Sequence, residues 1–136
     1  MRIFNKRASF EYELTGEKIE AGIVLTGMEA KAVRTTGADL SQAYVKILGN
    51  EVFLINANIA SSTGSRKLLL HRKEILALTT KMHQGKLAIV PVELYNKKRL
   101  VKLKLTLGKP KRKFEKKEAV KQMDIQRDID LEFKNR

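Results

Sequence analysis

The sequence predicts a mainly β protein, an antiparallel barrel or sandwich with packed helices. Short apolar segments recur between polar turns that contain Gly or Asn, which is typical of short strands. Two segments have helical spacing, and there is no strand-helix-strand repeat of the kind that builds a parallel sheet. The 136 residues suffice for one core and are too few for two well-packed cores with a linker.

The first elements are expected to be a hairpin and a helix. Strands are predicted at 10–14 and 19–26, with Thr15-Gly16-Glu17-Lys18 as the turn between them. A helix is predicted to begin at Gly27 and to stop at Thr35-Thr36-Gly37, because its apolar residues recur with helical spacing.

A second hairpin and a second helix are expected next. Strands are predicted at 44–48 and 51–57, flanking Gly49-Asn50, a two-residue turn typical of tight hairpins. A polar loop should follow over 56–65, and a helix is expected over about 72–82 with Gly85 as its stop.

The last strands are predicted at 87–95 and 100–107. Pro91 should place the first of them at a sheet edge or at a bulge, because proline cannot donate to a β ladder. In the second, four apolar residues alternate with polar ones, so one face enters a core and the other presents a row of ammonium groups. The apolar residues are Val101, Leu103, Leu105 and Leu107, and the polar ones are Lys102, Lys104 and Thr106.

The charge distribution points to a polyanionic partner. The net charge is +13, and the segment from Lys97 to Lys117 has 11 basic side chains and one carboxylate, Glu115. Such a segment can neutralise several phosphates together, so RNA, DNA or an anionic membrane surface would all fit. Phe10, Tyr12 and Tyr95 are interpreted as core residues, with stacking on unpaired bases as the alternative.

The sequence gives little support to catalysis, cofactors or a membrane span. It has no cysteine, two histidines, no phosphate-cradling glycine motif and no apolar run near 20 residues. The N-terminus lacks the apolar core of a signal peptide, so a cytoplasmic protein without cofactor or metal is expected. A magnesium site with Glu11, Glu13 and Glu20 is the enzymatic alternative, Glu11 and Glu13 being expected on one strand face.

Four blocks of the sequence resemble the SmpB family, whose members partner transfer-messenger RNA in the rescue of stalled bacterial ribosomes. The blocks are Asn5-Lys6-Arg7-Ala8 with Glu11-Tyr12, the run 19–27 with Glu29, Lys31 and Arg34, the run 66–72, and Val90-Pro91 with Leu94-Tyr95. The resemblance implies an OB-fold-like antiparallel β-barrel with flanking α-helices and a basic C-terminal tail. Residues 1–108 would form the RNA-binding barrel, and residues 109–136 a tail that is disordered when free and helical on the ribosome.

The resemblance also implies partners and sites. The partners would be the tRNA-like domain of transfer-messenger RNA and the 30S subunit of the 70S ribosome, with alanyl-tRNA synthetase and elongation factor Tu indirectly; the chain is expected to be a monomer. Together with the basic face, the RNA-binding residues would be Lys6, Arg7, Glu20, Lys67, Leu69, His71, Lys97, Lys98, Arg99, Lys102 and Lys104. Those at the decoding centre or in the mRNA channel would be Phe10, Tyr12, Lys109, Lys111, Arg112, Lys113, Lys116, Lys117 and Lys121.

The sequence departs from the family pattern in a loop over 58–65 that is shorter than usual, and in two features that bear on RNA contact. Phe10 stands where the family commonly has His, which would preserve stacking and remove a hydrogen bond. The end of the chain carries four acidic residues, more than RNA contact favours: Asp124, Asp128, Asp130 and Glu132. A general ribosomal or RNA-chaperone protein of OB type is the alternative function.

Overall fold

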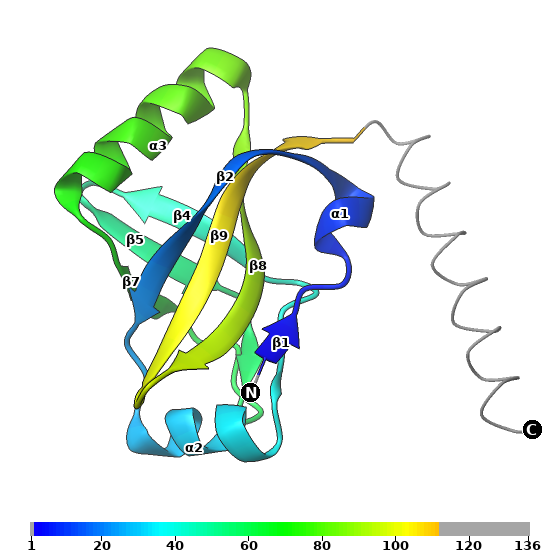
Figure 1. Cartoon of the computed structure of the whole chain (residues 1–136), viewed down its shortest axis with the longest axis vertical. Coiled ribbons are helices and arrows are strands. Elements are labelled where there is room, and N and C mark those ends of the chain that lie inside the picture. The colour runs from blue at the N-terminus through cyan, green and yellow to red at the C-terminus, as the bar shows by residue number, and fades with distance from the viewer. Residues whose placement is uncertain (1, 112–136) are drawn as a thin grey trace, which may run out of the picture.

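The computed structural model describes residues 2–111, and the elements of this part surround one core (Figure 1). The strands are β1 (Arg2–Phe4), β2 (Tyr12–Ile23), β3 (Ala38–Asp39), β4 (Tyr44–Leu48), β5 (Glu51–Ile55), β6 (Asn58–Ile59), β7 (Arg66–Leu69), β8 (Ala88–Lys97) and β9 (Leu100–Pro110). The helices are α1 (Ala8–Glu11), α2 (Gly27–Thr35) and α3 (Arg72–Gly85). The tail expected to be helical on the ribosome lies outside the described residues from position 112 onward.

Seven strands form one antiparallel sheet in the order β1-β8-β9-β2-β7-β5-β4, and β3 pairs with β6 beside it. Every pairing is antiparallel. The predicted mainly β class is therefore confirmed, as are the helix from Gly27, the helix that begins at Arg72 and the hairpin around Gly49-Asn50.

The sheet is not closed as a barrel, which corrects the expected architecture. Within residues 2–111 no ladder joins β4 to the other end of the sheet. The edge of β8 that closure would need is already occupied, because Phe4 pairs with Glu93 there and the Asn5 amide donates to the Val92 carbonyl at 2.8 Å. Pro91 has no amide hydrogen to offer, and its carbonyl accepts from Asn5 Nδ2 at 2.8 Å.

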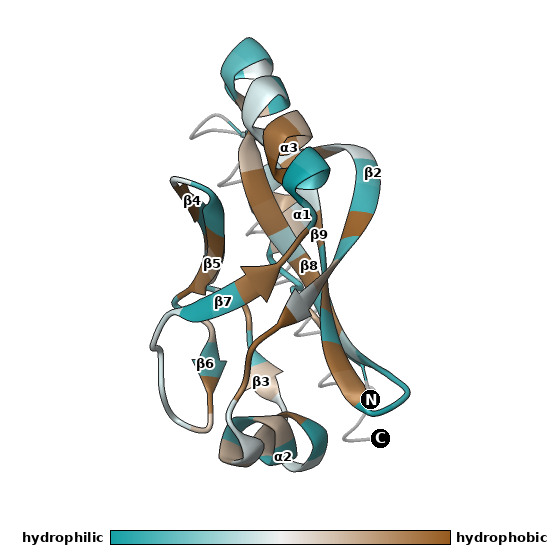
Figure 2. Ribbon diagram, turned by 90° about the vertical axis from the view of Figure 1, so that its left-hand side faces the viewer, coloured by the Kyte–Doolittle hydropathy of each residue, from teal (hydrophilic) through white to brown (hydrophobic). Residues whose placement is uncertain are grey.

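The core lies on the concave side of the curved sheet, as the hydropathy colouring in Figure 2 indicates. The alternation predicted for the last strand is confirmed, because Leu103 and Leu105 have no exposed surface. Val101 and Leu107 are also buried, whereas Lys102 and Lys104 lie on the opposite face. Apolar burial of this kind is the main driving force for folding.

The first predicted hairpin is wrong, because β2 is one strand that runs from Tyr12 to Ile23 with a bulge between Thr15 and Ile19. Both halves of β2 pair with β9, so no chain reversal occurs at Gly16. The buried Thr106 hydroxyl donates to the carbonyl oxygens of Thr15 (3.1 Å) and Glu17 (3.3 Å), which satisfies backbone groups that the bulge removes from the ladder. Phe10, expected in a strand, lies in α1.

Local signals fix the remaining boundaries. Thr26 and Glu29 form a reciprocal capping box at the start of α2, and Lys86 with φ 51° ends α3. Pro91 lies at the predicted bulge, since the β8–β9 register shifts between Pro91 and Glu93. None of the helices described in residues 2–111 is long and apolar enough to cross a membrane.

Candidate nucleic-acid interface

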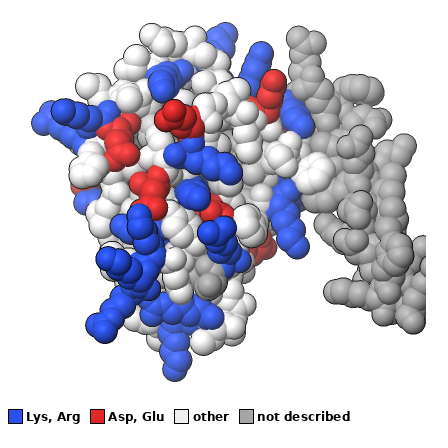
Figure 3. Space-filling model, in the orientation of Figure 1, with Lys and Arg blue, Asp and Glu red and all other residues white. Residues whose placement is uncertain are grey.

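One side of the sheet faces away from the core, and we name it the outer face; it is formed by β7, β2, β9, β8 and β1. Basic side chains from distant parts of the chain come together on it. The strand register sets two adjacent rows on it. One row contains Glu20, Lys104, Glu93 and Phe4, and the other contains Leu69, Gly22, Lys102, Tyr95 and Arg2. Figure 3 shows Lys and Arg side chains spread over this side of the molecule, with carboxylates between them.

Glu20 lies between cations on the outer face. Its carboxylate accepts a hydrogen bond from the Tyr95 hydroxyl and lies 3.4 Å from Lys97 Nζ. The Tyr95 hydrogen bond, followed by the nearby charges of Lys97 and Lys102, holds the pKa of Glu20 below its ordinary value of 4.5. Glu20 is therefore ionised at neutral pH and acts as a hydrogen-bond acceptor within a basic surface.

Glu93 and Lys104 pack around the Tyr95 ring. The Glu93 side chain is 6% exposed, and its carboxylate lies 3.3 Å from Lys104 Nζ. Lys104 Nζ in turn lies 5.2 Å from the centre of the Tyr95 ring, within the range of a cation–π contact. Burial, and then the hydrogen bond to Glu20, raise the pKa of Tyr95, so its hydroxyl remains a donor. The Tyr95 ring is buried, as the prediction of a core residue requires, although it lies on the outer face and not in the main core.

The β8–β9 hairpin holds the densest group of basic residues in the described part of the chain. Lys98 turns the hairpin with φ 59°, and the Arg99 carbonyl accepts from Arg34 Nη2 at 2.6 Å. The Lys97 side chain is 62% exposed, and Lys98 and Arg99 are also exposed. The hairpin therefore carries its charges toward solvent, where phosphates can reach them.

Lys67 and Leu69 extend the outer face onto β7. Leu69 is 55% exposed and stands opposite Gly22, where an added Cβ would lie 3.3 Å from the Leu69 Cβ. Lys67 is about half exposed and lies 3.8 Å from Glu51. His71 is exposed immediately before α3, and its amide donates to Glu74 Oε1 at 3.0 Å. The structure thus places Leu69 and Glu20 on the same face of adjacent strands.

Arg66 supports this region from the core side, a role that the sequence analysis missed. Its side chain is 4% exposed, and Nε donates to Glu29 Oε2 at 2.7 Å. The remaining guanidinium hydrogens bind four carbonyl oxygens, those of Ala57, Ile59, Ser62 and Gly64, at 2.7 to 3.3 Å. One buried guanidinium therefore ties β7 to α2 and to the loop before β7. The sequence gave no signal of this network, because a basic residue beside Lys67 in a short strand reads as part of the basic surface.

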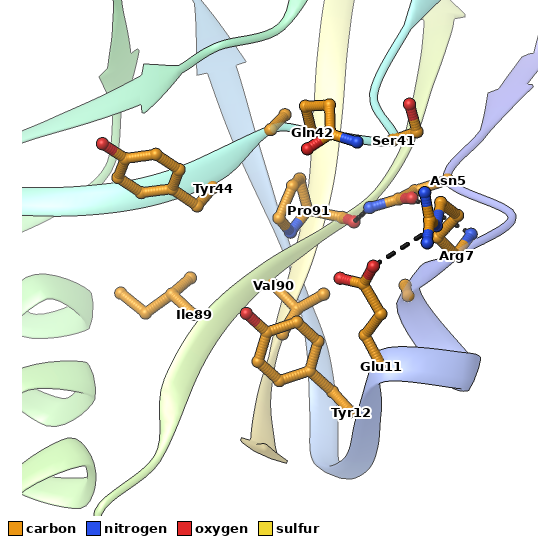
Figure 4. Close-up of a pocket in the computed structure, with 12 residues that line it drawn as sticks. Asn5, Arg7, Glu11, Tyr12, Ser41, Gln42, Tyr44, Ile89, Val90 and Pro91 are labelled. Carbon is orange, nitrogen blue, oxygen red and sulfur yellow. Dashed lines mark hydrogen bonds and ion pairs between the residues drawn. The ribbon is translucent and has the colours of Figure 1, made fainter. Parts of the chain in front are cut away.

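A second group of predicted residues lies apart from the outer-face centre, at the cleft between β4 and β8 (Figure 4). The cleft, of about 160 Å³, is lined by Arg7, Tyr12 and Tyr44 among others. Arg7 Nε lies 3.3 Å from Glu11 Oε1, and the dashed contact in Figure 4 marks this pair. Lys6 is exposed and Phe10 is partly buried on the same loop and helix. The structure therefore places Arg7 at this cleft and apart from Glu20, with which the sequence analysis had grouped it.

The last described residues belong to this second group. Lys109 is exposed in β9, and Lys111 Nζ donates to the Ser9 carbonyl at 2.9 Å. The other predicted tail residues lie outside the described part: Arg112, Lys113, Lys116, Lys117 and Lys121.

The carboxylates considered for magnesium are not brought together. Glu11 ends α1, so it does not share a strand face with Glu13 as expected, and Glu13 and Glu20 stand opposite Lys109 and Lys104 at separate points of β9. In residues 2–111 no three His, Asp or Glu side chains form a group that could hold a metal ion.

A curved antiparallel sheet with a basic outer face is typical of proteins that bind nucleic acids with one side of a sheet. The profile of the SmpB protein family matches residues 2–135. The chain therefore belongs to the SmpB family.

Individual relatives agree with this assignment. The chain is 42% identical to an SsrA-binding protein of Sulfurihydrogenibium sp. (strain YO3AOP1), over 97% of this chain and 93% of the relative. It is 37% identical to an SsrA-binding protein of Mycoplasma mycoides subsp. mycoides SC, over 90% of each. A solved structure described as "tmRNA-SmpB: a journey to the center of the bacterial ribosome" matches 88% of this chain and 94% of its own, with 34% identity and a TM-score of 0.66.

Proposed function

We propose that the protein binds transfer-messenger RNA and acts as an adaptor of trans-translation on stalled ribosomes. Membership of the SmpB family identifies the RNA and the ribosome as partners. The structural observation that carries the proposal is the outer face, where Lys97 and Lys102 lie near the ionised carboxylate of Glu20 and Lys104 is its register partner on β9. The cations would bind phosphates, and the carboxylate would accept hydrogen bonds from base amino or imino groups.

The roles of the individual residues follow from their places. Glu20, Leu69 and Lys67 would contact the tRNA-like domain, with His71 at the end of the same strand region. Lys97, Lys98, Arg99, Lys102 and Lys104 would neutralise its phosphates. The second group would face the ribosomal decoding centre. It consists of Arg7 and Tyr12 in the cleft, together with Lys6, Phe10, Lys109 and Lys111. The residues beyond Lys111 would extend into the mRNA channel.

The adaptor role includes steps that involve further proteins. The bound RNA would be charged by alanyl-tRNA synthetase, carried by elongation factor Tu and accepted at the A site in place of a tRNA. The protein itself would act without catalysis, as a monomer, in the cytoplasm. Incubating it with RNA and magnesium should leave the length and base composition of the RNA unchanged; a changed product would contradict the non-enzymatic role.

Sequencing of RNA that co-purifies with the protein tests the function. Transfer-messenger RNA should dominate, and its binding should survive competitor tRNA and weaken steeply as salt rises. Equal recovery of any folded RNA would instead support the general RNA chaperone. The Lys102→Gln variant should lower the salt slope by about one unit, whereas Lys46→Gln on β4 should not change it.

A further inference from the structure

Phe4 is an exposed aromatic residue in a basic setting. It is 57% exposed although it belongs to a strand of the main sheet. Its register partner is Glu93, whereas its neighbour Ile3 pairs with Leu94 and packs against the core. Because side chains alternate along a strand, the Phe4 ring lies on the outer face, in the row that also contains Lys104 and Glu20.

Arg2 lies in the next row of the same edge. It pairs with Tyr95, which pairs in turn with Lys102, and Arg2 is exposed. Phe4 therefore has a guanidinium two residues before it on its own strand and the Lys104 ammonium across β8 in its own row. An apolar protein partner would have to desolvate these charges, whereas RNA supplies phosphates for the cations and base faces for the ring.

We propose that Phe4 and Arg2 form a nucleotide-binding subsite on β1. Phe4 stacks on an unpaired base, and Arg2 neutralises an adjacent phosphate. The subsite extends the outer face from Leu69 on β7 to the other edge of the sheet, so an RNA segment bound at Glu20 continues over β8 onto β1. This inference rests on the RNA-binding function proposed above and adds to it a stacking contact between a base and the Phe4 ring.

The first experiment uses the absence of tryptophan from the chain. In Phe4→Trp the indole is the sole tryptophan, and titration with the tRNA-like domain of transfer-messenger RNA should quench its fluorescence as a base stacks on it. The matched control is Leu76→Trp, at a position that is 68% exposed on α3, at the opposite end of the molecule from β1 in Figure 1. The control should bind the same RNA without quenching; equal quenching in both variants, or none in Phe4→Trp while RNA binds, overturns the subsite.

The second experiment separates stacking from apolar surface. Phe4→Tyr should bind the RNA as the wild type does, whereas Phe4→Leu should weaken binding about tenfold because it removes a base–aromatic stack. Arg2→Gln should lower the salt slope by about one unit. Unchanged affinity in Phe4→Leu would overturn the subsite but not the function, because the wild type would still bind.

Two other outcomes have distinct meanings. If the wild type itself does not bind this RNA, both the subsite and the proposed function fail. If Phe4→Leu reduces ribosome association but leaves RNA affinity and Phe4→Trp fluorescence unchanged, the exposed ring contacts protein, and the subsite is overturned.

Discussion

Tyr95 on β8 reaches across β9 to donate a hydrogen bond to the carboxylate of Glu20 on β2. The ring is fixed by burial and by Lys104 above it, so the hydroxyl has one preferred direction. Glu20 is thereby held ionised and in place before RNA arrives. Such preorganisation reduces the entropy that binding must otherwise overcome.

Removing that hydroxyl should disturb Glu20 without disturbing the sheet. In Tyr95→Phe the ring still fills its site, while the pKa of Glu20 loses the largest of its lowering causes and rises toward 4.5. A lowered pKa stabilises the fold above pH 4.5, and this contribution is lost as the pH falls through the folded-state value. The variant should therefore retain less of this pH-dependent stability, and an NMR titration of the Glu20 carboxyl should show its higher midpoint.

RNA affinity should also depend on the hydrogen bond from Tyr95 to Glu20. Tyr95→Phe should weaken binding of the tRNA-like domain several-fold, and should have no further effect in a Glu20→Gln background because the two residues act as one unit. Tyr44→Phe, which alters an exposed tyrosine on β4, is the control. Additive effects of the two substitutions would show that Tyr95 does not act through Glu20.

Leu69 offers a prediction on the other side of Glu20. Leu69→Asp puts a carboxylate beside the expected phosphate path and should lower RNA affinity at least tenfold, measured by filter binding or anisotropy. Leu48→Asp is matched to it, since Leu48 is exposed to a similar degree on β4, 52% against 55%. If both variants lose affinity equally, the effect comes from net charge, and Leu69 has no special contact.

The sequence predicted those parts of the fold that local rules control. Alternation in 100–107, the turn at Gly49-Asn50 and the helical spacing from Gly27 each act over a few residues, and each prediction was confirmed. The bulge in β2 was misread as a turn, because a polar run that contains Gly is typical of turns. Gly16 does take a left-handed φ of 82°, but it does so within the bulge. Only its long-range pairing with β9 and the Thr106 hydrogen bonds distinguish the two.

The site was predictable in part for the same reason. A row of lysines in β9 follows from alternation, and the family resemblance pointed to Glu20 and Leu69, which the sheet places near one another. The sequence could not show that β1 adds to the outer face, because that depends on pairing with a strand about 90 residues later. Nor could the sequence show that Arg7 lies apart from Glu20, because only the tertiary structure places Arg7 at the β4–β8 cleft.

Arg66 should be the most sensitive charged residue for stability. Arg66→Met leaves the partly buried Glu29 without its guanidinium and frees four carbonyl oxygens, which should reduce the free energy of unfolding by about 3 kcal/mol. Lys67→Met is the neighbouring control, because the exposed pair with Glu51 contributes less than about 1 kcal/mol. Urea unfolding measures both, and equal small losses would contradict the structural role of Arg66.

Removal of the residues after Lys111 should separate RNA binding from ribosome function. The described part keeps the outer face, and Lys111 retains its contacts with Ser9 and with the Glu11 carbonyl. A chain that ends at Lys111 should therefore bind the tRNA-like domain within a few-fold of the full chain, while peptide tagging on stalled ribosomes is lost. A quantitative tagging assay beside an affinity measurement checks this, with Leu69→Asp in the full chain as the complementary variant that loses binding first. Loss of RNA binding with tagging retained would reverse the division of roles between sheet and tail.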